Sequence, residues 1–160
     1  MIYVAGKYIS KERLRLWRQL LRDMDYNVSS SWLDETLTES FDDSSMPPPY
    51  YQNVATEPQM LANAKMDMDE VLAADTIVLD TLDPSETGGR EVELGLALGK
   101  GADFVLVGPK RNIFHHLAGL QFDTWDDLMA SAEANRAMER NRPEVVQFEA
   151  SIDMELNPHA

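Results

Sequence analysis

Short apolar runs alternate along this chain with segments of helical periodicity, and that alternation limits the folds open to it. The runs are rich in β-branched residues and predict strands at residues 2–5, 27–32, 76–79, 104–107 and 120–122. Apolar residues at helical spacing predict helices after Ser10, over 57–73, over 89–99, and from an Asp123 cap to about residue 132. Such an order predicts an α/β fold, namely a doubly wound, Rossmann-like or flavodoxin-like parallel sheet of about five strands with helices on both faces.

The length of the chain fits one domain. With 160 residues it is large enough to bury a core and hold a preformed pocket. We assign residues 1–142 to this domain and 143–160 to a C-terminal extension, since periodic signals weaken there. The stretch 33–56 is acidic and rich in Ser and Pro, and it is either a solvated insertion or a segment that covers the substrate.

Charge and composition exclude several classes of function. A net charge of -14 argues against binding of a nucleic acid polymer, which needs clustered Lys and Arg, although a small anion remains possible. There is no Cys, and the three His lack ligand spacing, so we predict neither a metal site nor a cofactor. No apolar run is long enough to span a membrane and the start MIYVAGKY does not resemble a signal peptide, so a cytoplasmic location is expected.

Two loops are expected to border a ligand site, because parallel sheets bind ligands beyond the carboxyl ends of their strands. The first follows Val4 and contains Gly6. The second follows Leu79 and contains Asp80 and the pair Gly88 and Gly89 at the start of the next helix. Adjacent glycines allow close approach of a ligand to backbone amides, although they also occur in ordinary tight turns.

The first turn of that helix carries two candidate carboxylates, Glu91 and Glu93. They are two residues apart and therefore point about 200° apart on a helix, so only one can face the sheet edge. Periodicity does not choose between them, and acidic residues in a first turn often only complement the helix dipole.

The run from Ala74 through Gly101, together with MIYVAGKY, resembles the nucleoside 2-deoxyribosyltransferase family and the related deoxynucleoside 5'-monophosphate N-glycosidases. The resemblance implies that Glu93, in the sequence Val92-Glu93-Leu94-Gly95, is the catalytic nucleophile. It also implies that Asp67, seven residues before Ala74, is the general acid and base. A carboxylate beside an anomeric carbon and a second carboxyl that carries a proton suit cleavage of an N-glycosidic bond.

Further positions are assigned to the substrate by their place beside the same crevice. They are Gly6, Tyr8, Trp32, Asp80, Thr87, Gly88, Gly89 and Asn112. Transferases of the family often have an acidic residue six positions before the nucleophile, where this chain has Thr87, as is more typical of the monophosphate hydrolases. Asn112 follows the pattern of family members in which an Asn reaches a neighbouring subunit's pocket, so the resemblance also implies a homodimer or a larger homo-oligomer.

The resemblance therefore implies an enzyme that transfers a deoxyribosyl group between nucleobases through a glycosyl-Glu93 intermediate. The first alternative is hydrolysis of a deoxynucleoside 5'-monophosphate to free base and sugar phosphate. The second is a protein without catalytic activity that binds a nucleotide or a protein partner through its acidic surface.

Overall fold

A four-stranded parallel sheet forms the centre of the molecule. The computed structural model describes residues 1–35, 55–84 and 88–143, and within them the sheet has the order β1 (Ile2–Ala5), β2 (Thr76–Asp80), β3 (Asp103–Val107) and β4 (Leu120–Phe122). All residues of β1 and β2 are buried, in agreement with their continuous apolar sequence. The predicted α/β fold with a parallel sheet is therefore confirmed.

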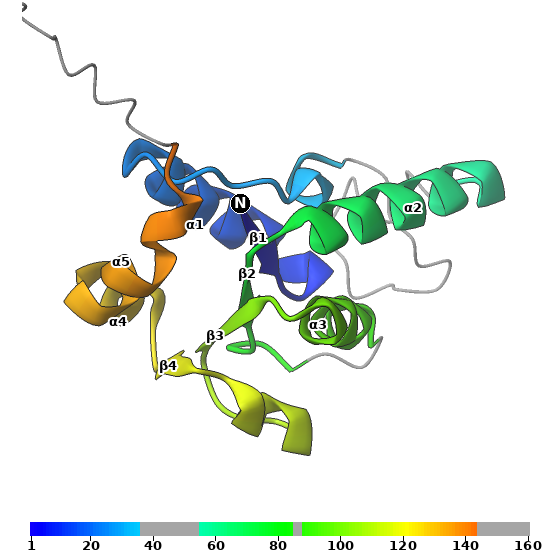
Figure 1. The fold of residues 1–160 in the computed structure, drawn as a ribbon. Helices are drawn as coiled ribbons and strands as arrows, with labels where there is room; N and C mark the ends of the chain where they lie inside the picture. Colours follow the sequence, from blue (N-terminus) through cyan, green and yellow to red (C-terminus); the bar gives the residue numbers. More distant parts are fainter. Residues whose placement is uncertain (36–54, 85–87, 144–160) are drawn as a thin grey trace, which may run out of the picture.

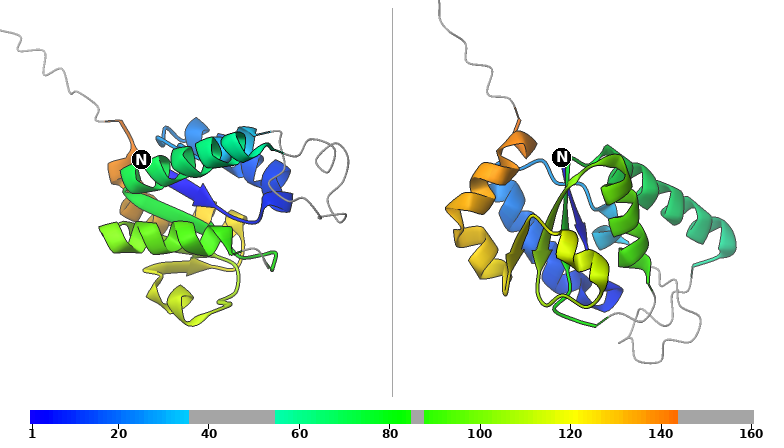
Figure 2. Two further views of the ribbon diagram at one scale, coloured as in Figure 1. Left: turned by 90° about the vertical axis from the view of Figure 1, so that its right-hand side faces the viewer. Right: turned by 60° about the horizontal axis from the view of Figure 1, so that its bottom comes forward.

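Helices lie on both sides of this sheet (Figures 1 and 2). One side holds α1 (Lys11–Asp23), α4 (Trp125–Ala130) and α5 (Ala132–Met138), and the other holds α2 (Glu57–Ala73) and α3 (Gly89–Lys100). Single turns of 3-10 helix connect these elements at η1 (Tyr8–Ser10), η2 (Ser31–Asp34), η4 (Ile113–Leu117) and η5 (Glu139–Asn141). The paired helices α2 and α3 pack against each other and carry both candidate catalytic carboxylates.

The strand predicted at residues 27–32 is wrong as a full strand. The chain there makes only one isolated parallel bridge, from Val28 to Ile2, and then turns at Ser30, whose φ is 60°. Side chains replace the missing backbone pairing at Val4. The Ser30 hydroxyl accepts a hydrogen bond from Val4 N at 2.6 Å, and the Trp32 indole donates to Val4 O at 2.8 Å. The outer edge of β1 is thus satisfied without a fifth strand.

The last helix also departs from the prediction. Thr124, not Asp123, caps α4 by accepting a hydrogen bond from Asp127 N at 3.1 Å. Ser131 then ends α4 and caps α5 through Ala134 N, so one predicted helix is two short ones. Serine and threonine hydroxyls compete for backbone donors, which explains the break at this position.

Helices α2 and α3 begin as their sequences require. Thr56 and Gln59 form a reciprocal capping box at the start of α2. Gly88 opens α3 with a φ of 76°, and Gly101 closes it with a φ of 85°, both in the left-handed region that favours glycine. The predicted helices over 57–73 and 89–99 are confirmed. Among the described helices, none combines the length and the apolar character needed to cross a lipid bilayer.

Candidate active site

The centre of the candidate site is a contact between a strand and a helix. Tyr3 of β1 is fully buried, and its hydroxyl donates a hydrogen bond of 2.7 Å to Oε1 of Glu93 on α3. Burial, followed by the charges of Glu93 and Asp67, raises the pKa of Tyr3 far above its usual value. The phenol therefore keeps its proton and acts as a permanent donor to the Glu93 carboxylate.

Asp67 belongs to the same surroundings. It lies half-buried on α2, and its charge acts on the Tyr3 phenol, as does that of Glu70 one turn further along the helix. Glu70 is held by the backbone of η2, since its Oε2 accepts a hydrogen bond from Ser31 N at 2.9 Å. Carboxylate charges from α2 and α3 thus act on one buried phenol of β1.

Glu91 points to a different environment, as the angular separation of the two glutamates requires. Its Oε2 lies 2.9 Å from Nε2 of the buried His115 and 3.0 Å from Nδ2 of Asn112, and its Oε1 lies 3.2 Å from Nε of Arg90. Nδ1 of His115 accepts a hydrogen bond from Arg111 N, which leaves Nε2 to carry the proton toward Glu91. Burial acts to raise the pKa of Glu91, but the hydrogen bonds from His115, Asn112 and Arg90 outweigh it and lower that pKa.

The carboxylate of Asp80, at the carboxyl end of β2, accepts hydrogen bonds from other residues of the protein. It is 1% exposed, and its Oδ2 accepts from Arg13 at 2.6 Å and from the Trp125 indole at 2.6 Å. Its Oδ1 accepts from Arg13 at 3.1 Å and from Leu82 N at 3.1 Å. Both oxygens thus join α1 and α4 to the sheet edge, which is a structural role for a residue assigned to the substrate.

The glycines of the second loop lie where the sequence places them. Gly88 is the N-cap of α3 and Gly89 its first residue, and an added Cβ at either position meets no atom within 4 Å. The buried Arg90 beside them donates to the Asp80 carbonyl at 3.2 Å and to the Asp83 carbonyl at 2.7 Å. This arginine holds the loop to the start of the helix and leaves the outer side of the two glycines open.

Gly6, at the end of β1, lies in close contact with α1. A Cβ there would lie 2.4 Å from Leu14 Cδ1 on α1, closer than real atoms approach. The glycine lets α1 cross the end of the strand, and this explains the residue without a ligand.

Tyr8 and Trp32 stand together beyond β1. Their ring centroids are 6.4 Å apart, and the buried Lys11 places its ammonium 4.4 Å from the Tyr8 ring centre. Burial lowers the pKa of Lys11 to about 8. Trp32 is 6% exposed and its indole N–H is bound by Val4 O, so its main role here is packing, whereas Tyr8 is half-buried and keeps an accessible edge.

Both polar atoms of the Asn112 side chain make hydrogen bonds within its own chain. Its Oδ1 accepts hydrogen bonds from Phe114 N at 2.8 Å and His115 N at 3.2 Å, capping η4, while its Nδ2 donates to Glu91. The side chain is thus used within one subunit.

The residues that sequence reasoning overlooked are Tyr3, Glu70, Arg13 and His115. Tyr3 lies within an apolar strand, so the sequence pattern assigns it to the core. Its hydroxyl is the one feature that indicates a further role, since a buried phenol needs a hydrogen-bond partner. Arg13 and His115 gave no signal of their own, because their partners are distant in sequence.

Three parts of the prediction lie outside the described residues. They are Thr87, most of the stretch 33–56 and the extension after Pro143. Within the described ranges no three His, Asp or Glu side chains are grouped to hold a metal ion. No model of a known protein family matches the chain, and no curated protein matches it.

Proposed function

We propose that the protein is an enzyme that cleaves the N-glycosidic bond of a 2'-deoxynucleoside and transfers the deoxyribosyl group to another nucleobase. The observation that carries the proposal is the hydrogen bond from the buried Tyr3 to Glu93, in a setting where Asp67 acts on the same phenol. A nucleophile and an acid-base carboxyl are the two groups that this chemistry requires.

The place of these residues in the fold also supports the proposal. Val28 pairs with one side of β1, and β2 pairs with the other side. The chain connections that follow β1 and precede β2 therefore lead to opposite sides of β1. We propose that Val28 represents a reduced fifth strand of a doubly wound sheet. The crevice between such diverging connections is where open α/β sheets bind ligands.

The electrostatics of the site suit the proposed transition state. Cleavage of an N-glycosidic bond develops positive charge on the sugar, and the carboxylate of Glu93, bound to the Tyr3 phenol, supplies negative charge to stabilise it. The neutral phenol orients the nucleophile and adds no charge of its own to the site.

The reaction proceeds in two halves. An oxygen of Glu93 bonds to the anomeric carbon while the bond to the base breaks, and the carboxyl of Asp67 gives its proton to the departing nitrogen. The acceptor base then loses a proton to Asp67 and bonds to the anomeric carbon, and the Glu93 carboxylate leaves. Two displacements retain the configuration of the sugar.

The test is incubation with a deoxynucleoside, its 5'-monophosphate and a second free base. A new nucleoside supports transfer, whereas free base with sugar phosphate identifies a hydrolase that uses the same carboxylates. Absence of cleavage with every nucleoside and nucleotide offered would leave a protein that binds without catalysis.

A covalent adduct gives a second, independent readout. A 2-fluoro-deoxynucleoside slows breakdown of the glycosyl intermediate, and mass spectrometry of digested protein should locate the added sugar on Glu93. Glu91→Gln is the matched control and should still form the adduct. An adduct on Glu91, or none during turnover, contradicts the assignment.

A further inference from the structure

A buried hydroxyl beside the candidate site has no hydrogen-bond partner. Ser31 is the first residue of η2, and its backbone N–H donates to Glu70 at 2.9 Å. Its side-chain Oγ is shielded from solvent and makes no hydrogen bond with any described residue. Buried polar groups in proteins are nearly always hydrogen-bonded, because an unpaired one has lost water and gained nothing in exchange. The Ser31 hydroxyl therefore needs a partner from outside the chain.

The two residues that flank Ser31 have side chains with a structural role. Oγ of Ser30 accepts a hydrogen bond from Val4 N at 2.6 Å, and the Trp32 indole donates to Val4 O at 2.8 Å. With the bond from its own N–H to Glu70, the backbone of Ser31 is held on both sides and at its centre. The hydroxyl of Ser31 is therefore not needed to place this segment.

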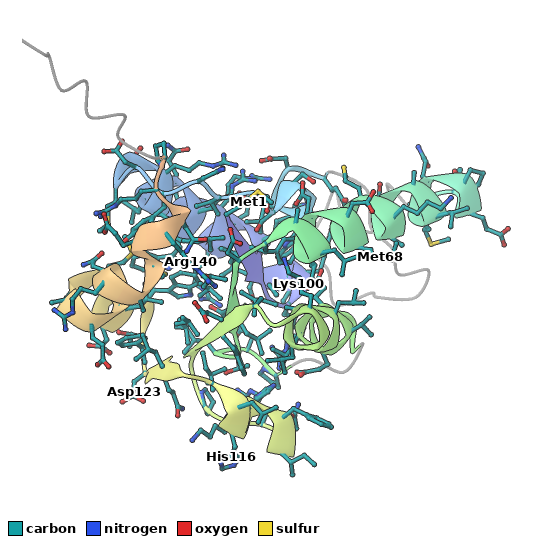
Figure 3. All side chains as sticks on the ribbon, viewed as in Figure 1. Met1, Met68, Lys100, His116, Asp123 and Arg140 are labelled. Carbon is teal, nitrogen blue, oxygen red and sulfur yellow. The ribbon has the colours of Figure 1, made fainter. Side chains whose placement is uncertain are left out.

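Ser31 lies on the side of α2 that is remote from α3. Helix α2 contacts both α3 and η2, and Figure 3 shows it between them, with Met68, the neighbour of Asp67, labelled on it. In the proposed reaction the sugar is bound at Glu93 on α3, and the departing base is bound at Asp67 on α2. The base therefore extends from Asp67 toward η2, where Ser31 and Glu70 lie.

The hydroxyl and the carboxylate together suit the edge of a nucleobase. Such an edge presents an N–H next to a ring nitrogen or a carbonyl oxygen. A carboxylate accepts hydrogen bonds, and Oε1 of Glu70 is the oxygen that Ser31 N does not bind. A serine hydroxyl can donate, so the N–H of the base can bind Glu70 while the adjacent acceptor binds Ser31. Both residues are partly exposed, and rotation about χ1 of Ser31 turns its Oγ outward.

We propose that the hydroxyl of Ser31 binds the nucleobase of the substrate, beside the carboxylate of Glu70. The inference rests on the proposed function and deepens it, because it assigns the part of the substrate that Glu93 does not contact. Ser31 touches the base and not the bond that breaks. Its contact is the same in the bound substrate and in the transition state, so it should act on KM rather than on kcat.

Stability measurements on two adjacent serines test whether the hydroxyl is needed for the fold. Ser31→Ala removes an unpartnered buried oxygen, so the midpoint of urea unfolding should stay the same or rise. Ser30→Ala, the matched control, removes the acceptor of Val4 N and should lower the midpoint. Neither result depends on a substrate. A fall for Ser31→Ala as large as that for Ser30→Ala overturns the proposal, because the hydroxyl then serves the fold.

Steady-state kinetics with deoxynucleosides test the contact with the base. Ser31→Ala should raise KM roughly 10-fold and change kcat by less than about twofold, because it removes one hydrogen bond that is made equally before and in the transition state. Ser31→Thr keeps the donor and should have a KM close to that of the unaltered protein. A KM that is unchanged in Ser31→Ala for every deoxynucleoside that is cleaved overturns the proposal and leaves the proposed function standing.

Binding of free nucleobases, measured by calorimetry, separates this contact from the proposed function. The unaltered protein should bind at least one of adenine, guanine, cytosine and thymine roughly 10-fold more tightly than Ser31→Ala does. Deoxyribose, which has no base, should bind both proteins equally. Weaker base binding by Ser31→Ala in a protein that cleaves no deoxynucleoside supports the contact and rejects the proposed function. Equal binding of the bases, no binding of any base, or an equal loss for deoxyribose overturns the contact.

Discussion

Glu91 and Glu93 are two residues apart on α3 and have different hydrogen-bond partners. Glu91 is surrounded by donors, which are His115, Asn112 and the guanidinium of Arg90. Glu93 accepts from the neutral Tyr3, on which the charges of Asp67 and Glu70 also act.

Under the proposed function, the difference separates a structural anion, Glu91, from the proposed nucleophile, Glu93. The donors that lower the pKa of Glu91 stabilise its charge and occupy its carboxylate oxygens. Glu91 therefore connects η4 to α3, and its oxygens are already used within the protein. Glu93 has a neutral donor in Tyr3, and in the proposed reaction its carboxylate stabilises the positive charge that a glycosyl transition state develops. One turn of α3 therefore contains a structural carboxylate, Glu91, and a candidate nucleophile, Glu93.

The largest expected effect comes from Glu93→Gln. An amide keeps the shape and can still accept from Tyr3, but it cannot bond to the anomeric carbon, so kcat should fall roughly 1,000-fold or more. Steady-state release of base measures this, with thermal unfolding to verify the fold. Glu91→Gln should retain most activity, and equal losses in the two variants would remove the distinction between them.

Tyr3→Phe should have the next largest effect on activity. It removes a hydrogen bond to a charged group, which is worth about 1.5–3 kcal/mol, so kcat should fall roughly 10- to 100-fold. The fall should be in kcat rather than KM if Tyr3 orients the nucleophile. Tyr26→Phe is a matched control, because Tyr26 also donates from a buried ring but bonds to Asn135, far from α3. A loss of stability without a change in kcat would make Tyr3 a packing residue.

The sequence predicted the parts of this comparison that depend on local periodicity. Short apolar runs located β1 to β4, and helix geometry separated Glu91 from Glu93. It did not predict that His115 and Asn112 bind Glu91, because η4 meets α3 only through the fold. The full strand predicted at 27–32 is wrong. There Ser30 and Trp32 bind the edge of β1 through side-chain hydrogen bonds, and such bonds leave no periodic pattern in the sequence.

Glu91→Gln should lower stability rather than activity, by about 1–2 kcal/mol at neutral pH, because a charged acceptor for His115 becomes neutral. The folded pKa of Glu91 lies below the unfolded value near 4.5. Its contribution is therefore complete above that value and is lost as the pH falls through the folded pKa. Denaturant titrations of both proteins should converge once the pH has fallen below the lowered folded pKa of Glu91, and a difference that persists at still lower pH would contradict the role of the charge.

Asn112→Ala should have the smallest effect. It removes the cap of η4 and one of the donors to Glu91, and loss of a cap costs about 1 kcal/mol. Urea unfolding measures this loss, and KM for the nucleoside should not change, because both polar atoms of the Asn112 side chain are used within its own subunit. Asn112→Asp is the informative partner variant, since it keeps the cap but sets a second carboxylate against Glu91, and it should destabilise the protein more than alanine does. A rise in KM with unchanged stability would instead assign Asn112 to the substrate and move the boundary of the site from Glu93 to include the η4 side of α3.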